Sequence, residues 1–234
     1  MSSQPTIVIV PGAWQKPVAW DGFQQQLNAA GYPTEYVAMK TVGGTELPLA
    51  GLEDDVAEVK AVLARLQGEG KKALLLCHSS GGLVGSNSVE GFDVAGVIYM
   101  SAFLIPKGKS LLEMLGGNPL PWMVIQEDRV VGDAAALPQV AFNDLPAEDQ
   151  ARWAKEMTHT SIRLFASPSG YEPWANSVAC KYIFCTQDNA LPFPIQQQMA
   201  GQLGPDAATV TLDASHCPHL SIPDKVVEAI KTLA

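Results

Sequence analysis

ALLLCHSSGG, residues 73–82, joins an apolar run to a turn rich in serine and glycine. The first five residues have the continuous apolar character of a strand that is buried on both faces. The remainder leads into a helix that we expect over Ser80–Val89. A sharp turn from strand to helix needs small residues two positions before and two after its central residue, because strand and helix pack closely there. Cys77 and Gly81 meet that need around Ser79.

Strand and helix patterns alternate on both sides of this stretch. Apolar or β-branched runs predict the strands, and apolar residues at helical spacing predict the helices. The expected strands are Ile7–Val10, Thr34–Ala38, Ala73–Cys77, Val94–Ser101, Lys181–Thr186 and Thr209–Leu212. The expected helices are Trp20–Ala30, Leu52–Gln67, Ser80–Val89, Pro194–Leu203 and Ile222–Leu233. This order predicts an α/β fold with a sheet of about six mostly parallel strands and helices on both faces.

The segment 104–179 interrupts this alternation. It has no apolar strand of the core type, is rich in proline, and contains one predicted helix over Pro146–Met157. Such a segment is too long for a plain loop. We therefore expect one domain over 1–234, with a core of 1–103 and 180–234 and a largely helical cap inserted at about 104–179. A separate small domain is the alternative, although its core would be meagre.

Composition and charge limit the classes of partner. The chain has 234 residues, of which 47% are hydrophobic, and a formal net charge of −9. That charge repels phosphate backbones and anionic membrane surfaces, so we expect neither nucleic acid nor a membrane as a partner. The first residues lack the pattern of a secretory signal, which makes the cytoplasm the expected location. The sequence is compatible with a homodimer.

The four cysteines do not resemble a disulfide framework. Cys180 and Cys185 fall in one expected strand at an odd offset, which places them on opposite faces, so we expect free thiols. A zinc site from His78, His216, Cys217 and His219 is the alternative use of such side chains. The paired spacings typical of zinc ligands are missing, and we expect no metal.

Ser79 is a candidate nucleophile, and two other residues supply what its hydroxyl needs. A serine hydroxyl is a weak nucleophile and requires a positioned base. His216 follows the last expected strand and Asp188 follows the strand before it, so both lie where α/β sheets place their sites. Singly, Asp188 is also a common turn former and His216 an ordinary loop histidine. Together in this context, they favour a Ser-His-Asp triad.

The sequence resembles the compact branch of the α/β-hydrolases that contains plant methylesterases, hydroxynitrile lyases and small microbial esterases. The chain order Ser, Asp, His is the order of that fold. The resemblance covers most of the chain and rests on 11-PGAW-14, 77-CHSSGG-82, 101-SAF-103, 142-FNDLP-146, 187-QDNALP-192 and 216-HCPHLSIP-223. Pro11 stands where the branch usually has histidine, and Cys77 where it has glycine. Neither departure removes a catalytic group.

The resemblance implies acyl transfer. Ser79 would attack an ester carbonyl, His216 would be the base, and the N–H groups of Ala13 and Ser80 would bind the oxyanion, with no cofactor. The expected substrate is a small or medium-sized, largely apolar carboxylic ester, thioester or lactone. The side chains expected to line its pocket are Trp14, Phe103, Trp122 and Leu191; each is otherwise ordinary core.

Two other functions remain open. A lyase or another carbon–carbon cleaving or cyclising enzyme would use the same triad, and a small-ligand receptor would use the same fold without catalysis. In the hydroxynitrile lyases of this branch a lysine follows the catalytic histidine, whereas Cys217 follows His216 here. This difference weighs against cyanohydrin chemistry, but not against other carbon–carbon cleavage or cyclisation.

Overall fold

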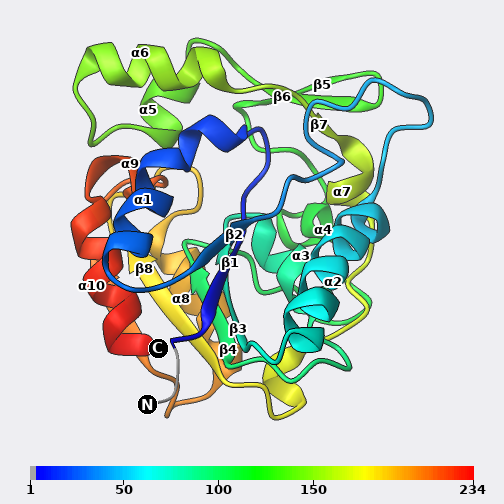
Figure 1. The fold of residues 1–234 in the computed structure, drawn as a ribbon. Coiled ribbons are helices and arrows are strands. Elements are labelled where there is room, and N and C mark those ends of the chain that lie inside the picture. Colours follow the sequence, from blue (N-terminus) through cyan, green and yellow to red (C-terminus); the bar gives the residue numbers. More distant parts are fainter. Residues whose placement is uncertain (1–3) are drawn as a thin grey trace.

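The computed structural model of the protein describes residues 4–234, in which a central sheet lies between two layers of helices (Figure 1). The sheet has six strands in the order β2-β1-β3-β4-β8-β9, and every neighbouring pair is parallel. The strands are β1 (Thr6–Val10), β2 (Thr34–Tyr36), β3 (Ala73–His78), β4 (Gly96–Met100), β8 (Cys180–Cys185) and β9 (Thr209–Leu212). The α/β fold predicted from the sequence is therefore confirmed.

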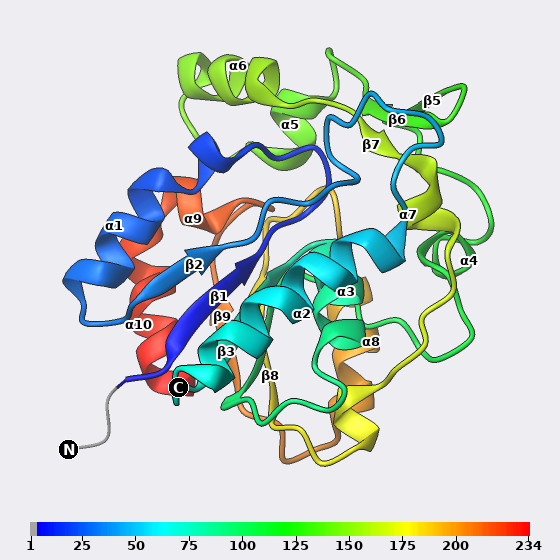
Figure 2. The same cartoon turned by 45° about the vertical axis from the view of Figure 1, so that its right-hand side comes forward.

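Helices cover both faces of the sheet (Figure 2). One face carries α1 (Asp21–Ala29) and α10 (Pro223–Leu233), and the other carries α2 (Leu52–Gly68), α3 (Gly81–Ser88) and α8 (Phe193–Ala200). Successive side chains of a strand point to opposite faces, so the residues of β1 pack alternately into the two apolar clusters. Burial on both faces explains why these strands are continuously apolar in sequence.

The predicted elements of the core lie where the sequence placed them, with ends that differ by two residues or fewer. The exception is the helix expected over Pro194–Leu203, whose last turn is the separate 3₁₀ helix η3 (Gly201–Leu203). Two other short helical turns are η1 (Pro17–Ala19) and α9 (Pro218–Ser221). No helix within residues 4–234 is long and apolar enough to cross a membrane.

The segment 104–179 contains both helices and a second sheet. Its helices are α4 (Leu111–Met114), α5 (Leu137–Ala141), α6 (Ala147–Glu156), α7 (Ile162–Ala166) and the 3₁₀ helix η2 (Pro173–Ala175). Its strands β5 (Met123–Gln126), β6 (Arg129–Gly132) and β7 (Thr160–Ser161) form an antiparallel sheet. In Figure 1 this small sheet lies with α5 and α6 on the side toward which β1 runs. The sequence predicted α6 but not the sheet.

The small sheet was missed because its turn lacks the usual residues. Two-residue hairpin turns need positive φ and normally use Asn, Asp or Gly first. Here Glu127 has a φ of 56°, an unusual conformation for glutamate. The third strand, β7, has only two residues, too few for a sequence pattern.

All four cysteines are free thiols, as the sequence predicted. Cys180 and Cys185 lie on opposite faces of β8, because they pack into different apolar clusters.

Candidate active site

Ser79 occupies the turn between β3 and α3. Its φ is 53°, in the left-handed region that is costly for residues other than glycine. Close packing of α3 against the chain after β1 leaves no room at Gly81, where a Cβ atom would lie 2.6 Å from the carbonyl oxygen of Pro11. Glycine at this position therefore allows the sharp turn that holds Ser79 at the end of β3.

Cys77 takes the place of the usual glycine in this turn. Its fully buried thiol faces Gly85 of α3, where an added Cβ atom would overlap the sulfur. The missing side chain at Gly85 thus makes room for the larger residue at Cys77. Burial raises the pKa of the Cys77 thiol, which keeps it neutral.

His216 and Asp188 are directly hydrogen-bonded. The Nδ1 atom of His216 lies 2.7 Å from Oδ2 of Asp188. His216 follows β9 and Asp188 follows β8, so adjacent parallel strands bring them together. The other carboxylate oxygen, Oδ1, accepts the main-chain N–H groups of Ala190 and Leu191, each at 2.8 Å. The hydrogen-bonded loop fixes the carboxylate toward His216.

Two residues that were not predicted as site residues also form hydrogen bonds with the Asp188 carboxylate. The hydroxyl of Ser101 donates to Oδ2, and the side-chain amide of Gln196 donates to the same oxygen at 3.3 Å. Ser101 directly follows β4 and has a φ of 46°. A polar residue just past a strand end was the signal that identified Asp188 and His216. Ser101 escaped it, because the strand expected from sequence included Ser101, whereas β4 ends at Met100.

The loop after β1 lies against the nucleophile turn. A Cβ atom on Gly12 would lie 2.7 Å from Cβ of Ser79, so only glycine fits there. The main-chain N–H of Ala13 donates to Oγ of Ser80 at 2.8 Å. Ala13 and Ser80, the two residues expected to supply main-chain donors, are therefore in direct contact.

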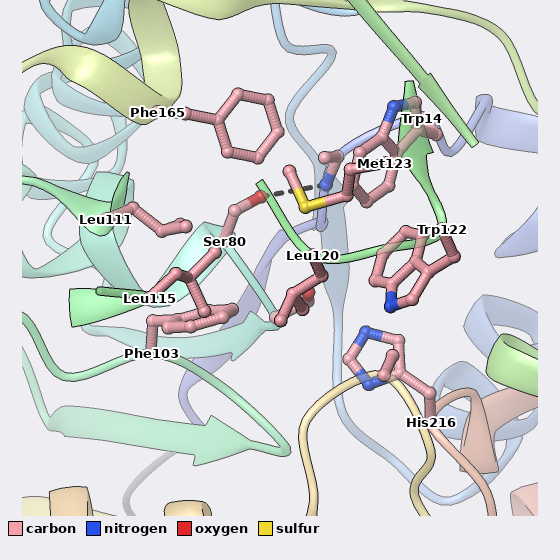
Figure 3. A pocket seen from close by; sticks show the side chains of 13 residues that line it. Trp14, Ser80, Phe103, Leu111, Leu115, Leu120, Trp122, Met123, Phe165 and His216 are labelled. Carbon is pink, nitrogen blue, oxygen red and sulfur yellow. Dashed lines mark hydrogen bonds between the residues drawn. The ribbon is translucent and has the colours of Figure 1, made fainter. Parts of the chain in front are cut away.

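One pocket brings most of the predicted site residues together (Figure 3). Ser79, Ser80, Ala13 and His216 lie along it with Trp14, Phe103 and Trp122. Further lining residues, which were not predicted from the sequence, come from the segment 104–179: Leu111, Leu115, Leu120, Met123 and Phe165. The walls are thus apolar, and the side-chain hydroxyl and imidazole groups come from two serines and one histidine.

Leu191 does not line this pocket, contrary to the expectation from sequence. Its side chain is buried in the core, while its main-chain N–H bonds Asp188. The neighbouring Ala190 lines the pocket instead. Because the Asp188 carboxylate accepts both amides, the loop curls around it and turns Leu191 inward.

Two further histidines lie near His216: the ring of His78 packs against those of His216 and His219, with centroids 4.7 and 5.2 Å away. His78 Nε2 lies 2.7 Å from the main-chain oxygen of His216, and His219 stacks on Trp20. The Cys217 thiol is buried and accepts the side-chain amide of Gln15 at 3.3 Å. Within residues 4–234 no three His, Cys, Asp or Glu side chains are grouped so that they could hold a metal ion.

Comparisons with known proteins find a matching family model and similar proteins. A family model described as "Alpha/beta hydrolase family" matches residues 7–229. A pyrethroid hydrolase of Sphingobium wenxiniae is 29% identical over 246 residues, which cover 97% of this chain and 87% of the relative. An alpha/beta hydrolase of Aspergillus novofumigatus is 26% identical, over 99% of this chain and 97% of its own length. The crystal structure of a pyrethroid hydrolase from Sphingobium faniae has a TM-score of 0.82 and 27% identity, covering 97% of this chain and 96% of that one.

Proposed function

The chain belongs to the alpha/beta hydrolase family, and we propose that it is a serine hydrolase that cleaves carboxylic esters. One observation carries the proposal. Ser79 on its strained turn shares an apolar pocket with His216, whose Nδ1 is hydrogen-bonded to the buried Asp188. The relatives named as pyrethroid hydrolases support hydrolytic chemistry.

The proposed mechanism uses the two nitrogens of His216 differently. Because Nδ1–H donates to Asp188, Nε2 is free to take the proton of Ser79 as its oxygen attacks the ester carbonyl. Asp188 then stabilises the imidazolium. His216 returns that proton to the departing alcohol, which leaves an acyl group on Ser79. His216 then takes a proton from a water molecule, whose oxygen attacks the acyl group, and returns that proton to the oxygen of Ser79 as the carboxylic acid leaves.

The oxyanion is bound by the main-chain N–H groups of Ala13 and Ser80 in this proposal. In the resting protein the Ser80 hydroxyl already accepts the Ala13 N–H at 2.8 Å. The carbonyl oxygen of the substrate takes that position when the Ser80 side chain rotates away. The exchange is favourable in the transition state, because a hydrogen bond to a charged oxygen is stronger than one to a neutral hydroxyl.

The pocket walls suggest how an ester is oriented. Because His216 must protonate the leaving alcohol, the alcohol half of the substrate lies on the His216 side of the pocket, next to Trp122 (Figure 3). The acyl half then lies between Leu111, Leu115 and Phe165, around Ser80 (Figure 3). Both halves meet apolar walls, which supports a small or medium-sized apolar ester as the substrate.

Substrate entry requires movement of the segment 104–179, which is the cap of this proposal. The free space in the pocket is about 20 Å³, enough for roughly one water molecule. Most of the apolar wall comes from this segment. We expect its side chains to move apart to admit an ester and to exclude bulk water afterwards.

Labelling of the nucleophile tests the proposed function. A fluorophosphonate should add once, at Ser79, and peptide mapping should find it there. Ser79→Ala should remove both the label and the turnover of p-nitrophenyl esters, while Ser80→Ala should still be labelled. A label on Ser80, or no reaction of the folded protein with either reagent, would contradict the proposal.

A further inference from the structure

Trp14 links the loop after β1 to the small sheet of the segment 104–179. We propose that Trp14 is a positioning residue through which β6 and β7 fix the Ala13 amide at the oxyanion site. This inference rests on the proposed function, because it assigns a role in the stabilisation of the same oxyanion.

Three hydrogen bonds hold Trp14 from different sides. Its main-chain N–H donates to Oγ1 of Thr160 at 2.8 Å, and its indole N–H donates to the main-chain oxygen of Val130 at 2.8 Å. Its own carbonyl oxygen accepts the N–H of Thr158 at 3.0 Å. The main chain and the side chain of Trp14 are therefore both tied to residues more than a hundred positions away in sequence.

The conformation of Trp14 needs such support. Its φ is 66°, in the left-handed region, which is unusual for a bulky side chain. Conformations of this kind persist only where surrounding contacts determine them. The indole ring also packs on Trp122 and Phe165 of the segment 104–179, with ring centroids 5.2 and 5.6 Å away.

The residues just before Trp14 touch the nucleophile turn. Gly12 is in close contact with Ser79, and the Ala13 N–H donates to the Ser80 side chain. Three consecutive residues, 12–14, thus connect the turn to β6 and β7. An oxyanion donor is effective only within a few tenths of an ångström of its place, and a displacement of about 1 Å can cost on the order of a hundredfold in rate.

Thr160 allows this link to be tested apart from substrate contact. Its side chain is fully buried and is not among the residues that line the pocket. The Thr160 hydroxyl accepts the Trp14 N–H, so we expect the loss of that hydroxyl to affect turnover through Trp14. Ser161, the next residue of β7, offers a matched control: it is also buried, and its hydroxyl accepts the N–H of Arg163 instead.

The experiment compares Thr160→Val, Thr160→Ser and Ser161→Ala in steady-state ester hydrolysis. Thr160→Val removes the acceptor of the Trp14 N–H at nearly constant volume. We expect kcat to fall about tenfold to a hundredfold with KM within about threefold, because the amide acts on the transition state. Thr160→Ser should restore kcat, and Ser161→Ala should stay within about twofold of the wild type.

A trifluoromethyl ketone gives a second measurement, because it adds to Ser79 and places an oxyanion among the same donors. Its affinity for Thr160→Val should fall by the same factor as kcat/KM. If Thr160→Val does not fold, Trp14→Phe replaces it: this variant removes the indole N–H together with one ring of the side chain, and it should also weaken binding of the inhibitor.

Three outcomes would overturn the inference while the wild type remains active and labelled at Ser79. These are equal losses in Thr160→Val and Ser161→Ala, an increase in KM alone, and an unchanged kcat with unchanged inhibitor affinity. A wild-type protein that neither hydrolyses esters nor reacts with a fluorophosphonate would instead overturn the proposed function and, with it, this inference.

Discussion

His219 stacks on Trp20 with ring centroids 3.7 Å apart and planes 5° from parallel. Within residues 4–234 neither ring nitrogen of His219 has a hydrogen-bond partner, and the ring is buried. Burial of the ring, together with a smaller effect of the nearby His216, lowers the pKa of His219 to about 3. Folding therefore requires a neutral ring at a pH where the unfolded chain carries a charged one.

We expect this ring to make the protein less stable in acid. Between about pH 6.5 and pH 3 the unfolded chain binds a proton at His219 that the folded protein does not, so the free energy of unfolding falls as pH decreases. His219→Phe keeps an aromatic ring on Trp20 and should reduce that pH dependence by up to one proton. It should also raise stability at pH 7, because no unpaired N–H is buried. Urea unfolding at pH 7, 6 and 5 measures both effects; an unchanged pH slope would contradict the prediction.

Asp55 should have the opposite pH dependence. Both of its oxygens accept hydrogen bonds from Thr41, at 3.0 and 2.6 Å, yet burial raises the pKa of its carboxyl to about 6. The pKa of Asp55 is higher in the folded protein than in the unfolded chain. Its contribution to the free energy of unfolding is therefore fully present below about pH 4 and is lost as pH rises to about 6. In Asp55→Asn the free energy of unfolding should decrease by up to about 3 kcal/mol less over this pH range than in the wild type. Urea unfolding at pH 4.5 and 7 should show a smaller decrease in the free energy of unfolding for the variant than for the wild type. An equal decrease in both proteins would contradict the prediction.

The assignment of the triad carboxylate can be tested with a neighbouring control. Asp188 is buried against His216, whereas the exposed Asp213 accepts the side chains of Thr186 and Gln187. Asp188→Asn should lower kcat by about ten-thousandfold, because the histidine loses its orientation and tautomer. Asp213→Asn should retain most of the activity. The reverse result would assign the acid to Asp213, and circular dichroism melts would show that both variants are folded.

The proposed orientation of the ester predicts two different changes in selectivity. Leu115→Ala should raise kcat/KM for longer acyl chains, because it enlarges the side around Ser80, and should leave the preference for alcohols unchanged. Trp122→Ala should broaden the range of alcohols instead, since it lies next to His216 (Figure 3). Two ester series, one varied in the acid and one in the alcohol, separate the effects. The same shift in both variants would mean that the orientation is wrong.

Sequence patterns predicted those parts of the site that depend on local structure. The apolar strand β3 and the small residues around Ser79 belong to one continuous stretch, and the positions of Asp188 and His216 follow from parallel strand ends. Thr160 carries no such pattern: it contacts Trp14 across 146 positions of sequence, and only the folded segment 104–179 brings the two together. The inward turn of Leu191 likewise depends on bonds to one carboxylate.

Ester hydrolysis and cyanohydrin cleavage can be separated at Cys217. A departing cyanide is negatively charged and is stabilised by a neighbouring cation, which the lysine after the histidine supplies in hydroxynitrile lyases. Here burial raises the pKa of the Cys217 thiol well above its usual range, so the side chain is neutral. The residues that line the pocket include neither lysine nor arginine. A departing alcohol needs only a proton, which His216 can provide.

We therefore expect hydrolysis of short activated esters and no cyanide release from mandelonitrile. Cys217→Ala should leave ester turnover within about tenfold of the wild type, a change of about 1.4 kcal/mol in the barrier, because the thiol lies outside the pocket lining. Cyanide release without ester hydrolysis would favour the lyase. Inactivity in both assays, with a ligand bound tightly in the pocket, would favour a receptor, because an intact Ser-His-Asp arrangement does not by itself require turnover.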